Sequence, residues 1–330
     1  MVIENQGYSN ILDYRHQQLQ SLNLNSIELN LLHDEIITQT LSIAYKKILQ
    51  TNGPPPSPFC FFVMGSAGRK EQGIWSDQDH GIIFEQDSPE IKAYFLKLGK
   101  EISEGLMQTG YPFCEGNVMA SNPFWCRSYV EWRQQLNNWT EDASWEAIRH
   151  LLTFIDSRTF LGEKRFIEEL TCYAYQLIDQ KKLLRRILDN TMHIKKAVGV
   201  FGQFITESHG PYSGCLNIKE AALYPYVNAG RILAIYEKLD ADSTIERFNR
   251  ISERVMPTHL REKYVTQFTA LQQYRLVYGL HTDYASGHYL AVDKLSQVEK
   301  KKVKEIIKDG VQLSDYVNKL FAKDENNGYE

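Results

Sequence analysis

The sequence predicts an α+β protein in which a small mixed sheet with flanking helices is followed by an all-α helical bundle. Three observations lead to this prediction. Short apolar runs that are typical of buried strands occur only in the first half of the 330-residue chain. A proline cluster and a glycine turn flank the first of these runs, and the second half contains helical patterns and their connections. Strands that precede helices, rather than alternating with them, are typical of α+β folds.

The composition fits a globular protein of two domains. The apolar fraction of 43% is enough for a real core, and the formal net charge of −4 gives no drive toward nucleic acid or acidic membranes. The five cysteines form no C-x-x-C pair, so we expect neither a disulfide framework nor a zinc ribbon. No signal peptide is apparent, and no stretch approaches the ~20 apolar residues of a membrane span. We therefore expect a cytoplasmic protein that binds neither membrane nor nucleic acid.

The first domain is predicted to cover residues 25–185, after a flexible arm over residues 1–24, which are polar and unpatterned. Ser26 is a suitable N-cap for the first helix, and the prolines that follow that helix lead into the first strand. The predicted elements are, in order, a helix over 26–49, a strand over 59–64, a tight turn at 65–68, a strand over about 76–85, a helix over 89–109, a strand within 111–120, and helices over 127–139, 144–159 and 163–190.

The second domain is predicted to be purely helical over residues 186–322, before a frayed tail at 323–330. We find no repeat period and no strand pattern in it. Lysines gather near the start of the last helix, where a solvated helix face explains them. The predicted helical segments cover residues 223–239, 243–253, 258–281 and 295–321.

Two aspartates on the second predicted strand are the first candidates for chemistry. Asp77 and Asp79 are two positions apart, which puts both carboxylates on one face of a strand, roughly 6.5 Å apart at the backbone. Carboxylates that close repel each other unless a cation lies between them or one is protonated. Mg²⁺, or Mn²⁺ in its place, would bind through such carboxylates and substrate phosphates. An Asp-x-Asp pair also occurs in ordinary loops, so its context decides between a metal site for nucleotidyl transfer and a chance pair.

The context is a glycine turn directly after the first strand. Gly65 and Ser66 at a helix start present backbone N–H groups and a hydroxyl, which suit phosphate oxygens. Gly68 lacks a Cβ and allows close approach of the backbone, and Arg69 carries donors that suit phosphate. An ordinary strand-to-helix turn also favours Gly and Ser. The turn and the acidic pair together favour a nucleotide-binding site.

These residues resemble the signature of nucleotidyltransferases, in which an apolar strand, Gly-Ser, about a dozen residues and Asp-x-Asp follow one another. More closely, residues 65–72 and 76–81 resemble a nucleotidyltransferase family of bacterial signal-transduction proteins, often linked to CBS or cyclic-nucleotide-binding domains. That family is related to the PII-uridylyltransferase and the glutamine-synthetase adenylyltransferase. Residues 114–125, 156–162 and 199–234 are similar to further blocks of the family, and the resemblance covers roughly residues 30–320.

The resemblance implies a polymerase-beta-like nucleotidyltransferase head and a companion C-terminal helical domain. It also implies Mg-dependent transfer of a nucleoside monophosphate from a nucleoside triphosphate to a protein or small-molecule acceptor, in signalling or regulation. Asp77 and Asp79 would be the catalytic and metal-binding residues. Because no sensor module is visible in the sequence, regulation would come from a separate regulatory chain or from the helical domain.

Two departures from the family pattern leave a second function open. Gln78 and His80 stand beside the aspartates, where the general signature prefers apolar residues. Active relatives usually add a third carboxylate from a later strand, but the aligned position here holds Cys114. Glu115 is the candidate third acid, although strand alternation would send it to the opposite face. The alternative function is therefore a non-catalytic nucleotide-binding sensor or interaction module with a degenerate active site.

Three further residues have simpler explanations. Asp156 and Arg158 are expected to form a structural ion pair. Trp125 is a candidate for lining a nucleotide pocket, but tryptophan is more often a core residue. None of the three enters the predicted site.

Overall fold

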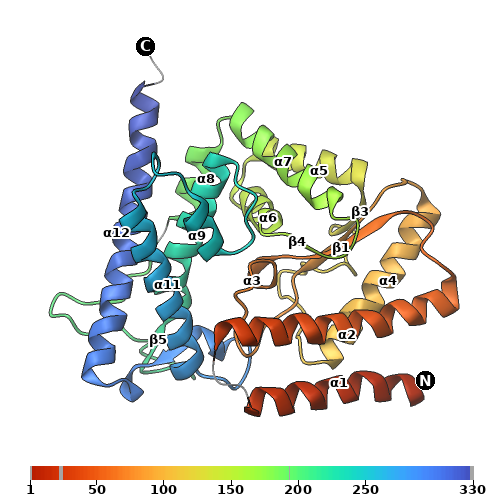
Figure 1. Ribbon diagram of the computed structural model, residues 1–330, viewed down its shortest axis with the longest axis horizontal. Helices are drawn as coiled ribbons and strands as arrows, with labels where there is room; N and C mark the ends of the chain where they lie inside the picture. Colours follow the sequence, from red (N-terminus) through yellow and green to blue (C-terminus); the bar gives the residue numbers. More distant parts are fainter. Residues whose placement is uncertain (1, 22–24, 193, 328–330) are drawn as a thin grey trace. The chain divides into compact units, whose positions relative to one another are not determined.

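The computed structural model describes residues 2–21, 25–192 and 194–327. The chain divides into two compact units, Met1–Leu177 and Ile178–Glu330. The first unit contains a four-stranded sheet with helices, and the second is helical with a small two-stranded sheet (Figure 1). The predicted fold class, a small mixed-sheet head followed by a helical domain, is thereby confirmed. The division falls inside helix α7, whereas the sequence placed it at residues 185 and 186.

Helices α2 and α4 lie close to their predicted ranges. The N-cap of α2 is Asn25 rather than the predicted Ser26, and the N-cap of α4 is Ser88; both side chains accept a hydrogen bond from the first turn. Helix α7 begins in this unit and continues past its end. The elements are α1 (Val2–Ser21), α2 (Ser26–Asn52), β1 (Phe59–Val63), α3 (Gly65–Gly68), β2 (His80–Phe84), α4 (Pro89–Gln108), β3 (Cys126–Ser128), α5 (Tyr129–Asp142), α6 (Trp145–Ile155), β4 (Arg158–Gly162) and α7 (Arg165–Gln180).

The sheet of the first unit has the strand order β3-β2-β1-β4. Strand β1 is antiparallel to β2 and β4, and β2 is parallel to β3, so the sheet is mixed. Side chains of β1 alternate between the two faces. Phe61 joins the core formed with α2 and α4, and the ring of Phe62 lies 5.6 Å from that of Trp132 on α5. Helices thus cover both faces of the sheet (Figure 1), which explains why β1 is a continuous apolar run.

The prediction of a strand within residues 111–120 is wrong. This segment pairs only at one bridge, between Phe113 and Gln78, and then turns, because Asn117 has a positive φ of 53° and its N–H donates to the Cys114 carbonyl. The third strand is β3 instead, a stretch of three residues that the sequence assigned to the start of a helix. A strand this short carries no periodic pattern.

Two further strand boundaries differ from the predictions. Strand β2 starts at His80 rather than near residue 76, because the preceding residues pair only through the bridge at Gln78. Strand β4 begins where a helix was predicted to continue to residue 159. Helix α6 ends at Ile155, and the chain turns directly into the sheet to pair with β1. The pairing with β1, a long-range contact, decides the conformation there.

The predicted flexible arm forms helix α1 where the structure describes it; residues 1 and 22–24 lie outside the described residues. Its buried face consists largely of Tyr8, Ile11 and Arg15, which are spaced three and four residues apart. Because one of these residues is charged, the apolar pattern is weak. Arg15 is 1% exposed, and its guanidinium donates to the Thr109 carbonyl at 2.9 Å and lies 4.2 Å from the Tyr111 ring centre.

The second unit is helical except for strands β5 and β6, so the prediction of a purely helical domain needs correction. Leu216 of β5 pairs with Leu290 of β6, and both side chains are fully buried. Helix α12 continues to Asn327, although residues 323–330 were predicted to fray and 328–330 lie outside the described residues. The elements are α8 (Leu184–Thr191), β5 (Cys215–Asn217), the π-helical turn η1 (Lys219–Leu223), α9 (Tyr224–Glu237), α10 (Thr244–Arg250), α11 (Thr258–Tyr278), the 3-10 turn η2 (Ser286–His288), β6 (Tyr289–Ala291), the 3-10 turn η3 (Val292–Lys294) and α12 (Gln297–Asn327).

The core of the second unit lies among its longest helices. Ile232 and Leu233 of α9, Phe268 of α11 and Ile306 of α12 are all fully buried. Tyr226 adds a buried hydroxyl that donates to the Ile306 carbonyl at 2.8 Å. Among the helices that the structure describes, none is long and apolar enough to cross a membrane.

Replacing Arg15 tests whether α1 is part of the fold. Arg15→Ala should lower the free energy of unfolding by about 3 kcal/mol, because it removes the donors to the buried Thr109 carbonyl and to the Ile74 carbonyl. Gln17→Ala, an exposed position on the same helix, should change it by less than about 0.5 kcal/mol. Urea denaturation measures both. Equal stability of Arg15→Ala and the wild type would contradict the docking of α1.

Candidate functional site

The glycine turn and the acidic pair meet at the junction of β1 and β2. Val63, the last residue of β1, pairs with His80, the first residue of β2. Just beyond this pair, the N–H of Met64 donates to the Asp79 carbonyl at 2.8 Å. Gly65 then turns with a φ of +57°, a region that glycine adopts without strain. A Cβ on Gly65 would lie 2.5 Å from Asp79 Oδ2. The turn therefore favours glycine, and any side chain here would displace the carboxylate that faces it.

Asp77 and Asp79 are flanked by two polar residues that point the other way. Gln78 is 3% exposed and His80 is 1% exposed, and the His80 Nε2 lies 2.8 Å from Gln78 Oε1. The other ring nitrogen, Nδ1, accepts from the Ala120 N–H at 3.1 Å. Nε2 must therefore carry the proton and donate to Gln78. Burial lowers the pKa of His80 to about 3, so the ring stays neutral.

These two polar side chains fix both ends of the loop that carries Cys114. At its start, Gln78 Nε2 donates to the Tyr111 carbonyl at 3.0 Å, and the Gln78 N–H donates to the Pro112 carbonyl. At its end, the His80 N–H donates to the carbonyl of Val118. The departure from apolar residues beside the aspartates thus has a structural explanation. Gln78 and His80 bind the loop to the strand.

The loop brings a thiol to the two carboxylates. One ligand atom from each of Asp77, Asp79 and Cys114 lies within 4.8 Å of the others, and all three residues are partly buried. Glu115, the candidate third acid, is exposed and is not part of this group. The position that the sequence aligned with a third carboxylate is therefore occupied by the Cys114 Sγ, and a role for Glu115 stays a prediction.

The chemistry of this donor set fits a divalent cation. Two carboxylates are the ligands that Mg²⁺ and Mn²⁺ prefer, and a thiol is a softer donor that suits them less. Burial, together with the negative charges of Asp79 and Asp77, raises the pKa of Cys114 to about 12. The thiol is consequently neutral near pH 7 and adds no negative charge to that of the two aspartates.

Ser66 lies on the same turn, at the start of α3. Its hydroxyl is 3.4 Å from that of Ser76, which in turn donates to the Asp77 carbonyl at 3.2 Å. Helix geometry leaves the first N–H groups of α3 without an intrahelical partner. Gly65 and Ser66 thus lie beside the carboxylates, and their predicted contact with phosphate stays a prediction.

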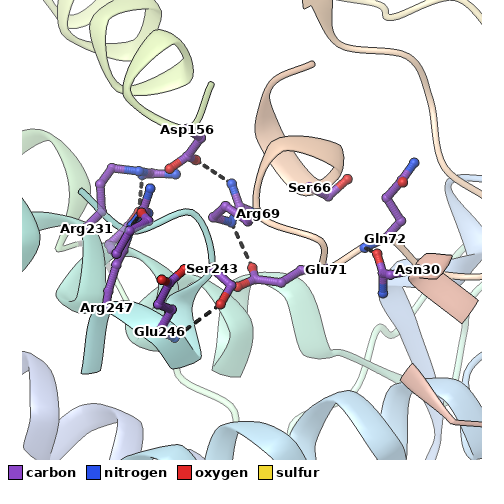
Figure 2. Close-up of polar contacts among 12 residues, drawn as sticks. Asn30, Ser66, Arg69, Glu71, Gln72, Asp156, Arg231, Ser243, Glu246 and Arg247 are labelled. Atoms are coloured by element: carbon purple, nitrogen blue, oxygen red, sulfur yellow. Dashed lines mark hydrogen bonds and ion pairs between the residues drawn. The ribbon is translucent and has the colours of Figure 1, made fainter. Parts of the chain in front are cut away.

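Arg69, which was predicted to contact phosphate, binds two carboxylates in the structure. Its Nε lies 2.7 Å from Glu71, and its Nη1 forms an ion pair with Asp156 (Figure 2). The side chain is 12% exposed. Burial alone would lower the pKa of Arg69, but the charges of Asp156 and Glu71 outweigh this effect and raise it. The guanidinium is thereby bound by two carboxylates of its own unit.

Gly68 and Arg158 also connect α3 to its neighbours in the first unit. A Cβ on Gly68 would lie 1.8 Å from the Asp156 carbonyl oxygen, so the glycine lets α3 pack against the end of α6. Arg158, which was expected to pair with Asp156, binds both carboxylate oxygens of Asp34 at 2.7 and 3.0 Å and the Ala67 carbonyl. The predicted ion pair is wrong. Each member has a different partner.

Trp125 is a core residue. It is 1% exposed, and its ring lies 5.8 to 5.9 Å from those of Trp139 and Trp132. This aromatic cluster packs between the sheet and helices α5 and α6, so the Trp125 ring does not line an open pocket. The simpler of the two explanations offered by the sequence therefore holds.

Two family models match the chain, one in each unit. The model described as "Putative nucleotidyltransferase DUF294" matches residues 13–146, and the model described as "Putative nucleotidyltransferase substrate binding domain" matches residues 181–321. The first match contains the glycine turn and all three members of the donor set. A comparison with curated proteins finds no match.

Substituting Gly65 tests the contact between the turn and the acidic pair. Gly65→Ala should lower the affinity for Mn²⁺ by roughly tenfold, because the new Cβ displaces the Asp79 carboxylate. Gly53→Ala is the matched control, since Gly53 also has a positive φ, of +79°, but a Cβ there meets nothing within 4 Å. It should lose stability and keep its Mn²⁺ affinity. Electron paramagnetic resonance of free Mn²⁺ measures the Mn²⁺ affinity of each variant. Equal affinities of Gly65→Ala and Gly53→Ala would contradict the contact between the turn and Asp79.

Proposed function

We propose that this chain, which belongs to the Putative nucleotidyltransferase DUF294 family and matches the model described as "Putative nucleotidyltransferase substrate binding domain" over residues 181–321, is a metal-dependent nucleotidyltransferase. In this proposal the first unit binds a nucleoside triphosphate, and the second contributes to binding the acceptor. The observation that carries the proposal is the group formed by Asp77, Asp79 and Cys114 beside Gly65.

The proposed reaction transfers a nucleoside monophosphate. A hydroxyl of the acceptor forms a bond to the α-phosphorus and gives up its proton, while the bond from that phosphorus to the bridging oxygen breaks and pyrophosphate leaves. Asp77 and Asp79 would hold Mg²⁺ or Mn²⁺, and Gly65 and Ser66 would contact phosphate oxygens. The bound cation would neutralise charge on the triphosphate and on the leaving group.

A protein acceptor in signalling or regulation is part of the proposal. The resemblance to the enzymes that modify PII and glutamine synthetase supports such an acceptor. A small-molecule acceptor is the alternative within the same chemistry. In either case control of the reaction would come from the second unit or from a separate regulatory chain.

One observation favours a second function, a nucleotide-binding sensor without catalysis. The third position of the donor set is a thiol where active relatives usually have a carboxylate. A site with two carboxylates can bind a metal–nucleotide complex and yet position it poorly for displacement. Transfer activity of the wild type distinguishes these two functions.

Removing the carboxylates tests the proposed site directly. Asp77→Asn/Asp79→Asn should lower Mg²⁺-dependent nucleotide affinity by roughly tenfold or more and abolish Mg²⁺-dependent pyrophosphate release, because the ion loses its charged ligands. Calorimetry with ATP, UTP, GTP and CTP measures binding, and incubation of each labelled triphosphate with cell extract reveals a labelled acceptor. If the double variant binds nucleotide as well as the wild type, these residues do not form the site.

Restoring a third acid distinguishes the enzyme from the sensor. Cys114→Asp should raise Mg²⁺ affinity by roughly tenfold or more, because a third negative charge joins the donor set. Cys172→Asp, at an exposed cysteine outside the site, is the matched control and should leave the affinity unchanged. A wild type that binds nucleotide but releases no pyrophosphate, together with a Cys114→Asp variant that gains release, would identify the sensor. Release by the wild type identifies the enzyme.

A further inference from the structure

A triphosphate beside this donor set needs cationic partners, and Arg69 is bound to carboxylates. Another guanidinium reaches the same loop. A Cβ built on Gly116 would lie 2.9 Å from Arg149 Nη2 and 3.6 Å from the Cys114 Sγ. The guanidinium of Arg149 and the thiol therefore border the same small space over Gly116. Cys114 in turn belongs to the group that contains Asp77 and Asp79.

Arg149 is available to a ligand. It lies on α6, is exposed, and within the described part of the chain has no carboxylate within salt-bridge distance. Its guanidinium lies 5.7 Å from the ring centre of Trp145, one helical turn earlier, and Trp145 is 58% exposed. A cation–π contact of this kind holds the guanidinium without neutralising its charge. Arg149 thus differs from Arg69, although both are on the same unit.

We propose that Arg149 binds the phosphate chain of the nucleoside triphosphate at this site and that Trp145 positions its guanidinium. The inference rests on the proposed function and names the contact that the site makes with its substrate. Guanidinium suits phosphate because its planar donors form two parallel hydrogen bonds to phosphate oxygens. Contact with phosphate rather than base means that all four nucleoside triphosphates depend on Arg149 to the same extent.

The experiment measures affinity for inorganic tripolyphosphate and for ATP, UTP, GTP and CTP, each with Mg²⁺, by calorimetry on the full chain. Arg149→Ala should lower all five affinities by roughly tenfold or more, and Arg149→Lys should lower them less. Arg133→Ala is the matched control. Arg133 also lies over a ring, that of Tyr173 at 3.8 Å, but on α5 and outside the site. It should leave the affinities unchanged.

A second measurement separates this inference from the proposed function. Mn²⁺ binding without nucleotide should be lost in Asp77→Asn/Asp79→Asn and should not be weakened in Arg149→Ala, because Arg149 contacts the phosphates and its charge repels the ion. Should Arg149→Ala bind tripolyphosphate as tightly as the wild type while the double variant does not, the inference fails and the proposed function stands. Should the wild type bind neither tripolyphosphate nor any of the triphosphates, both fail.

Trp145 has a test of its own. Trp145→Ala should lower the affinity for tripolyphosphate by about two- to fivefold, the size of an exposed cation–π contact, and Trp145→Phe should restore most of it. A loss restricted to some of the four nucleotides, with tripolyphosphate binding unchanged, would overturn the positioning role and assign the ring to base stacking.

Discussion

The candidate site depends on the two-residue alternation of the backbone from Asp77 to His80. The odd positions direct carboxylates to one face, and the even positions direct Gln78 and His80 into the protein, where they are 3% and 1% exposed. A shift of register by one residue would bury two carboxylates and expose the amide and the imidazole. Because burying unpaired carboxylates is very unfavourable, the register of this segment is strongly specified.

The same alternation makes the donor set rigid. Gln78 and His80 have partners for their buried donors and acceptors, and a fully satisfied buried network holds its members in one arrangement. The network is also uncharged, because the imidazole is neutral, so it adds no positive charge beside the carboxylates. From the other side, Gly65 gives Asp79 its room. Two strands and one loop therefore set the separation of the three ligand atoms.

The sequence predicted what depends on neighbouring residues and missed what depends on distant ones. The proximity of Gly65 to Asp79 follows from a strand, a turn and an antiparallel return, all of which leave local patterns. The actual partners of Asp156 and Arg158 leave no local pattern, because the register of β4 places Arg158 near Asp34 and Asp156 pairs with Arg69 instead. Arg149 on α6 likewise comes from a contact between a helix and a loop, whereas the family resemblance had already placed Cys114 at the third position of the donor set. The i, i+4 spacing of Trp145 and Arg149 was visible, but nothing local tied it to the site.

Charge connects these findings. Three carboxylates at one site would repel one another strongly and would require more cationic charge than two carboxylates and a neutral thiol do. A donor set with less negative charge also binds cations less strongly, so bound cations neutralise less of the charge on the triphosphate, and a nearby guanidinium would neutralise more of it. Arg69 does not provide it, because Glu71 and Asp156 already balance its charge. Arg149 is held over a tryptophan, and no carboxylate of the described residues lies within salt-bridge distance of it. In the proposed function, the substitution of a thiol for an acid and the presence of this guanidinium belong together.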